Sequence, residues 1–205
     1  MNIKIINHPL VQHKATLLRD KRTKPKQFRE LLKELSILMT YEITADLSLG
    51  EQVVETPLAS HSGKTLQEKI VLLPVFRAGL GMVEGFLTVI PTARVGHLGL
   101  YRDENTFNPV FYYQKLPDLS NAQVIVLDPM LATGGTASYC LEMLKEKNCK
   151  NVKLAFIICS VDGVKRLNRE HPEITIYTCE LDQDLNELAY IVPGLGDAGD
   201  RQFNT

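Results

Sequence analysis

The sequence has no surplus of positive charge. It contains 23 lysines and arginines against 24 aspartates and glutamates, which gives a net charge of −1. Nucleic-acid binding relies on a basic surface, so this balance argues against a nucleic-acid partner. No run of about 18 apolar residues is present, so we expect no membrane span. The N-terminus shows no charged-then-apolar leader, and we therefore expect a cytoplasmic protein.

The cysteines form no CxxC pair, and no histidine lies at zinc-ligand spacing around them. Cys140, Cys149, Cys159 and Cys179 are therefore expected to be reduced and partly buried, as in cytosolic proteins. The five histidines are scattered along the chain. None has an obvious nucleophile partner, so we expect all of them to be structural.

Length and patterning indicate one α/β domain spanning residues 1–205. Apolar residues make up 44% and charged residues 23% of the sequence, as in soluble globular proteins. Strand patterns alternate with helical patterns, which predicts a doubly wound, mostly parallel sheet. The predicted strands cover residues 70–74, 94–100, 110–114, 124–127, 152–159, 174–178 and 190–192. The predicted helices cover about 25–46, 79–89, 136–147 and 163–170, and the polar segment 50–66 is expected to form a hairpin or flap.

The segment from Val124 to Thr136 carries the clearest chemical signal. A run of aliphatic residues predicts a buried strand, and Asp128 follows where that strand would end. Thr133, two glycines and Thr136 then open a helix, whose free backbone N–H groups can cradle a phosphate. A carboxylate beside such a cradle suits sugar hydroxyls or a hydrated Mg²⁺. The glycines and threonines alone would equally fit an ordinary strand–turn–helix.

This segment resembles the phosphoribosyl-diphosphate (PRPP) loop of the type I phosphoribosyltransferases. Most of those enzymes carry two adjacent acids at the strand end. Here Pro129 follows Asp128, a form that is similar to that of the uracil phosphoribosyltransferase family. The resemblance extends from His8 to Asp200 and implies a small hood or arm over the active site. It also implies PRPP contacts from one run of residues, which we call the phosphate loop: Asp128, Pro129, Met130, Leu131, Ala132, Thr133, Gly134, Gly135 and Thr136.

Two arginines at predicted strand ends are candidate diphosphate ligands. Arg77 begins a glycine-containing loop, where its planar guanidinium could bond two oxygens at once. Arg102 lies in the segment 101–103, directly after the predicted strand at 94–100. Alternatively, Arg77 is an ordinary surface arginine beside a helix start, and Arg102 is a solvated charge in a loop. The resemblance implies that both arginines bind PRPP and that residues of about 103–112 form a mobile arm, whose closure would exclude water.

The glycine-rich segment from Tyr190 to Asp200, which we call the base loop, is the second strong signal. Its glycines match dinucleotide-binding spacing, but no further strand and helix follow, so we do not expect a dinucleotide site. Such a loop can bring backbone N–H and C=O groups to the edge of a flat base. Cytosine reverses the polarity of uracil at N3 and position 4, which would leave buried groups unpaired. The resemblance implies uracil contacts from Ile191, Gly196, Asp197 and Ala198, with Asp197 near PRPP as well.

The reaction implied by the resemblance is transfer of the phosphoribosyl group of PRPP to N1 of uracil, giving UMP and diphosphate. Positioning and charge stabilisation would supply the catalysis, with Mg²⁺ as cofactor and with Asp128, Arg102 and Asp197 as catalytic candidates. No general base is identified. The resemblance also implies a homodimer or larger homo-oligomer. It adds GTP as a candidate effector, for which the sequence shows no site.

Two alternatives remain open. A regulatory protein that binds nucleotide and RNA could keep the phosphate loop and lose the base site. The intact base loop and the balanced charge argue against this function. Transfer to another base, such as orotate or a purine, is the other alternative. The carboxylate of orotate would need a basic partner near the base loop, where Arg201 is the candidate.

Overall fold

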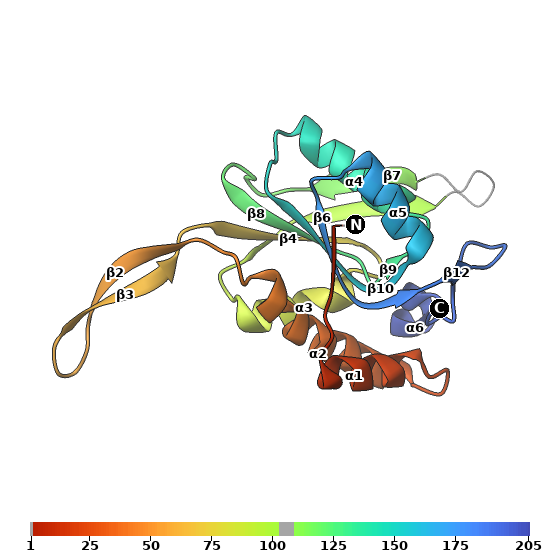
Figure 1. The fold of residues 1–205 in the computed structure, drawn as a ribbon, viewed down its shortest axis with the longest axis horizontal. Helices are drawn as coiled ribbons and strands as arrows, with labels where there is room; N and C mark the ends of the chain where they lie inside the picture. Colours follow the sequence, from red (N-terminus) through yellow and green to blue (C-terminus); the bar gives the residue numbers. More distant parts are fainter. Residues whose placement is uncertain (1, 103–108) are drawn as a thin grey trace.

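The computed structural model describes residues 2–102 and 109–205. Within these residues the chain forms a central sheet with helices on both faces (Figure 1). One face is covered by α1 (Pro9–Arg19), α2 (Pro25–Ile43) and α3 (Leu80–Val89). The other face is covered by α4 (Gly135–Glu146) and α5 (Val161–Glu170). This arrangement confirms the predicted doubly wound α/β fold.

The sheet is mainly parallel. Its strands are β1 (Ile3–Ile5), β4 (Lys69–Phe76), β5 (Arg94–Val95), β6 (His97–Arg102), β7 (Pro109–Lys115), β8 (Ala122–Leu127), β9 (Met130–Leu131), β10 (Val152–Ser160) and β11 (Thr175–Asp182). They follow the order β1-β11-β10-β8-β4-β6-β7, with β5 beside β4 and β9 beside β10. The edge strand β7 runs antiparallel to β6. The sheet therefore has parallel strands at its centre, where β4, β8 and β10 lie side by side.

Alternating side chains of the central strands build a core on each face of the sheet. On β8, Ile125 and Leu127 belong to the core under α1, α2 and α3, whereas Val124 and Val126 pack with α4 and α5. All four side chains are essentially inaccessible to solvent. Burial on both faces requires continuous aliphatic strands. This requirement explains why the strands at 124–127 and 152–159 were recognisable in the sequence.

The helix predicted at about 25–46 is confirmed but ends at Ile43. Thr44 caps it, and its N–H bonds to the carbonyl of Thr40. Helix α1 was not predicted, because it buries only a short apolar stripe made of Val11, Ala15 and Leu18. His8 caps this helix by accepting a hydrogen bond from the N–H of Leu10 at 3.1 Å. This contact gives His8 the structural role expected for the histidines.

The strands predicted at 94–100, 174–178 and 190–192 differ from the structure in their bounds. The strand predicted at 94–100 is divided into β5 and β6, and the strand predicted at 174–178 extends to Asp182. The end of the chain forms an antiparallel pair, β12 (Asp184–Leu185) and β13 (Ile191–Val192), followed by the short helix α6 (Ala198–Phe203). Helix α6 was not predicted, because glycines and polar residues give it no clear apolar period.

The segment at 50–66 forms the predicted hairpin. Strands β2 (Leu49–Glu55) and β3 (Ser60–Leu66) pair antiparallel and project far from the body of the molecule (Figure 1). Apolar side chains on this hairpin are open to solvent, and Val53 is 68% and Leu58 97% exposed. These side chains make the projecting hairpin a candidate contact surface.

The cysteines are free thiols, as predicted. Cys140, Cys159 and Cys179 are buried, and Cys149 is partly buried. Burial raises the pKa of each thiol above its ordinary value, so all four stay protonated and poorly nucleophilic near neutral pH. None of the helices in the described part of the chain has the length and apolar character needed to cross a membrane.

Candidate active site

A cavity of about 730 Å³ lies at the carboxyl ends of β4 and β8. The chain crosses from β4 to α3 on one face of the sheet and from β8 to α4 on the other face. Adjacent parallel strands whose connections leave in opposite directions create a crevice between the two outgoing loops. The fold itself therefore places a ligand site between the loop after β4 and the loop after β8.

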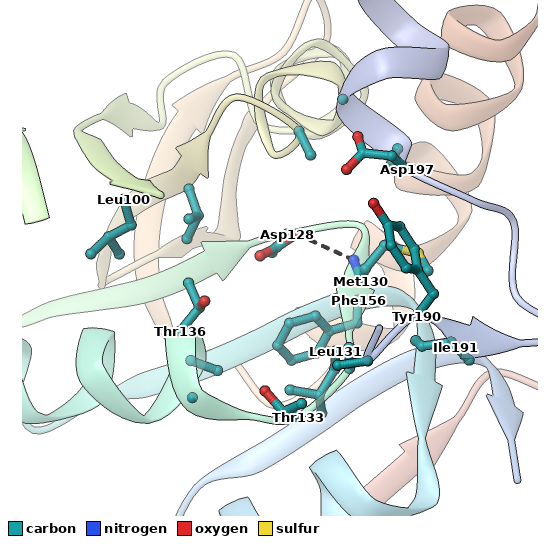
Figure 2. Close-up of a pocket in the computed structure, with 18 of the residues that line it drawn as sticks. Leu100, Asp128, Met130, Leu131, Thr133, Thr136, Phe156, Tyr190, Ile191 and Asp197 are labelled. Atoms are coloured by element: carbon teal, nitrogen blue, oxygen red, sulfur yellow. Dashed lines mark hydrogen bonds between the residues drawn. The ribbon is translucent and has the colours of Figure 1, made fainter. Parts of the chain in front are cut away.

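The cavity brings together most of the site residues predicted from sequence. Figure 2 shows Asp128 between Thr136 on one side and Tyr190 and Asp197 on the other. The predicted residues that line the cavity are Arg77, Asp128, Met130, Leu131, Ala132, Thr133, Gly134, Gly135, Thr136, Ile191, Gly196, Asp197 and Ala198. They come from three loops that are far apart in the sequence.

The start of α4 has the geometry of an anion cradle. Gly134 is the N-cap residue, with a left-handed φ of 80°, and no side chain caps the helix. A side chain at this position would be strained, and its Cβ would stand 3.1 Å from the carbonyl oxygen of Gly163. The first backbone N–H groups of α4 are therefore left for a ligand, at the positive end of the helix dipole. Thr133 and Thr136 flank this helix start at the cavity wall (Figure 2).

Helix α5 supports the phosphate loop from behind. The Ser160 hydroxyl donates to the carbonyl of Ala132 at 2.5 Å and accepts from the N–H of Gly163 at 2.9 Å. One side chain thus caps α5 and holds the backbone of the phosphate loop. Sequence reasoning missed Ser160, although a serine at the end of a strand and before a helix is a recognisable cap signal.

Asp128 is partly buried at the end of β8 and directs its carboxylate to the cavity (Figure 2). Its Oδ1 accepts a hydrogen bond from the N–H of Met130 at 3.2 Å. This bond orients the carboxylate relative to the loop that follows. Pro129 is buried and does not line the cavity, and its carbonyl accepts from Ile157 and Ile158 at 3.0 Å each. Pro129 therefore anchors the loop to β10 and lies behind the residues that line the cavity.

Arg77 lies at the opposite wall, in the loop after β4. Its Nη2 donates to Asp200 Oδ1 at 2.8 Å, and its Nη1 donates to the Thr205 hydroxyl at 3.2 Å. The side chains of Arg77 and Asp200 are 54% and 48% exposed, so this ion pair is well solvated. A solvated pair is weak and exchanges partners easily, which leaves Arg77 available to an anionic ligand.

The base loop ends in a helix instead of continuing as a loop. Asp197 is the N-cap of α6, and its carboxylate accepts from the N–H of Asp200 at 2.8 Å. Gly196, Asp197 and Ala198 reach the cavity at this turn. Asp200 also lines the cavity and was not singled out from the sequence. The spacing of Asp197 and Asp200, three residues apart, is typical of a helix cap. This spacing could have predicted helix α6 and pointed to Asp200 from the sequence.

The model of one protein family, described as uracil phosphoribosyltransferase, matches residues 5–205. The chain belongs to the uracil phosphoribosyltransferase family. A uracil phosphoribosyltransferase of Finegoldia magna is 53% identical over 205 residues, which cover 99% of this chain and 98% of that one. The corresponding protein of Dictyoglomus turgidum is 54% identical over 203 residues, with 98% of each chain covered.

Two solved structures share the fold of this chain. The AQ2163 protein of Aquifex aeolicus has a TM-score of 0.93 and 41% identity, covering 98% of this chain and 97% of that one. The adenine phosphoribosyl transferase of Trypanosoma brucei has a TM-score of 0.57 and 12% identity, with 88% of this chain and 84% of that chain covered. The second similarity shows only that the fold is shared with an adenine phosphoribosyl transferase.

Two further arginines were considered in the sequence analysis: Arg102 as a PRPP ligand and Arg201 as a partner for an orotate carboxylate. The backbone of Arg102 ends β6 and pairs with Pro109, while its side chain and residues 103–108 of the predicted arm lie outside the described part of the chain. Arg201 does not line the cavity. Its guanidinium donates to the carbonyls of Leu18 at 2.7 Å, Asp20 at 2.6 Å and Leu195 at 2.9 Å. It is therefore committed to the backbone, which argues against a carboxylate-bearing base such as orotate.

The carboxylates at the cavity fit a magnesium ion that arrives with a phosphate substrate. Within residues 2–102 and 109–205, no group of three or more His, Cys, Asp or Glu side chains could hold a metal alone. Mg²⁺ commonly takes one or two carboxylates and completes its shell with water and substrate phosphates. Asp128, Asp197 and Asp200 supply carboxylates on both sides of the cavity.

Proposed function

We propose that this protein transfers the phosphoribosyl group of PRPP to N1 of uracil and releases UMP and diphosphate. One observation carries the proposal. The phosphate loop and the base loop line a single cavity, so a phosphate group and a base can be bound together. The match to the uracil phosphoribosyltransferase family over residues 5–205 supports the same reaction.

The proposal assigns PRPP to three parts of the cavity. The start of α4, with Thr133 and Thr136, holds the 5′-phosphate through backbone N–H groups and hydroxyls. Asp128 accepts hydrogen bonds from the ribose hydroxyls. Arg77, together with Arg102, binds the diphosphate, because a guanidinium matches paired phosphate oxygens. Asp128 and Asp197 are the carboxylates that would help to hold a Mg²⁺ ion arriving with PRPP, and the ion would supply positive charge against the diphosphate.

The base loop selects uracil through its backbone. We assign the edge of the ring to backbone N–H and C=O groups of Ile191, Gly196, Asp197 and Ala198, which line the cavity. A base with the opposite donor and acceptor pattern leaves those groups unpaired, which costs affinity. Catalysis then consists of holding N1 of uracil beside C1 of the ribose while Arg102, Asp128 and Asp197 stabilise the changing charge. No general base is assigned.

Product formation with a panel of bases tests this function. In the presence of PRPP and Mg²⁺, we expect UMP and diphosphate from uracil, and no product from cytosine, orotate or hypoxanthine. Product from another base would keep the PRPP site and overturn the uracil assignment. If no base reacts although UMP binds, a regulatory function would replace the proposed enzyme.

We expect a cytoplasmic homodimer or larger homo-oligomer that uses the β2–β3 hairpin as a contact surface, without nucleic-acid or membrane partners. The double variant Val53→Asp and Leu58→Asp should lower the molar mass measured by light scattering, because both side chains are exposed apolar groups. Glu51→Gln on the same hairpin is the control and should leave the mass unchanged. A wild-type protein that is already monomeric would contradict the expectation.

GTP, the candidate effector, is tested by adding it to the assay of UMP formation.

A further inference from the structure

The end of α1 contacts the base loop directly, although the two are far apart in the sequence. Arg19 Nη1 donates to the carbonyl of Gly194 at 2.9 Å. The same guanidinium donates through Nη1 and Nη2 to the two carboxylate oxygens of Asp182, at 2.7 Å each. Asp182 Oδ2 in turn accepts from the N–H of Gly194 at 2.8 Å. Both polar groups of Gly194 are thus held by one ion pair.

A second arginine makes the reverse connection. Arg201, in α6, reaches back to the carbonyls of Leu18 and Asp20 at the end of α1, and it also bonds the carbonyl of Leu195 in the base loop. Its guanidinium stacks over the Phe28 ring at 4.5 Å. We call this reciprocal set of contacts, made by Arg19, Asp182 and Arg201, the arginine clasp.

The Arg19–Asp182 pair of the clasp is largely shielded from solvent. The side chain of Asp182 is 7% exposed and that of Arg19 is 20% exposed. Burial lowers the pKa of Arg19, but the hydrogen bond and charge of Asp182 outweigh it, and the pKa is raised above its ordinary value. The guanidinium therefore stays charged, and its bidentate contact with Asp182 is screened less by salt than an ion pair on the open surface.

Gly194 is held only through its backbone. Its φ is +56°, and a Cβ at this position would collide with the carbonyl oxygen of Ile191, so glycine is the residue that fits here. Without a side chain, it can be fixed in place only by contacts to its N–H and C=O groups. It lies between Ile191 and Gly196, both of which line the cavity. Arg19, Asp182 and Arg201 do not line the cavity themselves. Any effect they have on a ligand must pass through the base loop.

We propose that Arg19, Asp182 and Arg201 are positioning residues that set the base loop against the cavity and thereby determine uracil affinity and selectivity. This inference rests on the proposed function, because it assigns the base loop to uracil. The phosphate loop has its own support from Ser160 and β10. Loss of the clasp should consequently affect the base and leave PRPP largely unaffected.

Steady-state kinetics of three clasp variants test this inference. In Arg19→Met and Asp182→Asn, we expect KM for uracil to rise about tenfold to a hundredfold, since small misplacements of a positioning group have effects of that order. KM for PRPP should stay close to wild type, and the preference for uracil over cytosine should fall. Arg19→Lys should be intermediate, because lysine keeps the charge but cannot bond two carboxylate oxygens and a carbonyl together.

Asp46→Asn is the matched control. Asp46 forms an ion pair with the buried Lys153 at the other end of the sheet, away from the cavity. It should lower the melting temperature without changing KM for uracil. Equal changes in KM for both substrates, or a lower melting temperature with unchanged KM for uracil in all clasp variants, would show a merely structural role and overturn the inference. If wild-type protein makes no UMP, the proposed function itself fails, and this inference fails with it.

Discussion

Replacing Arg77 by alanine is expected to lower kcat/KM for PRPP by about 10²–10³-fold, the usual cost of removing one preorganised donor from a site of developing charge. Arg77 lies at the cavity wall, and its partner Asp200 holds it only through a solvated ion pair. The diphosphate of PRPP can therefore replace Asp200. UMP has no diphosphate, so its binding should change little.

The Arg77 prediction is checked by initial rates with varied PRPP and by calorimetric titration of UMP. Arg169→Ala is a suitable control, because Arg169 is also exposed and paired with a carboxylate, that of Glu170 on α5. The control should behave as wild type in both measurements. Equal losses for PRPP and UMP in Arg77→Ala would contradict a diphosphate role and would place Arg77 near the phosphate or the base instead.

Asp128→Asn is expected to lower kcat/KM for PRPP by roughly tenfold to a hundredfold while the fold remains intact. A hydrogen bond to a charged group contributes about 1.5–3 kcal/mol, and each 1.36 kcal/mol corresponds to about a tenfold change in rate. Asparagine keeps the shape and can still accept from the N–H of Met130, so the melting temperature should be nearly unchanged. The amide loses the negative charge that strengthens bonds to ribose hydroxyls.

The control for Asp128→Asn is Asp118→Asn, since Asp118 is an exposed aspartate paired with Lys69. Its PRPP kinetics should match wild type. Unchanged turnover and unchanged PRPP affinity in Asp128→Asn would remove Asp128 from the site. A large fall in melting temperature would instead assign the carboxylate to folding.

The parts of the site that were predictable are local in sequence. The segment from Val124 to Thr136 contains a strand, a carboxylate, two glycines and a helix start in direct succession. Each feature therefore supports the interpretation of its neighbours. The apolar runs of β8 and β10 were equally clear, because both of their faces are buried. Ligand loops at the carboxyl ends of such strands then follow from the topology.

The parts that were missed depend on contacts between distant residues. Arg19 and Gly194 are 175 positions apart, and no periodicity or motif connects them. Helix α1, which places Arg19, has only a short buried stripe. Arg201 looked available for a substrate carboxylate, and only its three-dimensional neighbours show that backbone carbonyls occupy it. Sequence patterns report local structure and burial, whereas the partner of a long polar side chain is set by the tertiary fold.

A crystal structure with UMP bound tests the central claim most directly. The account predicts the phosphate at the start of α4, bonded by backbone N–H groups of residues 133–136, with the ribose hydroxyls on Asp128. It predicts the edge of the uracil ring against the backbone of Ile191, Gly196 and Ala198. A phosphate bound away from α4, or a uracil ring that makes no contact with the base loop, would contradict the account.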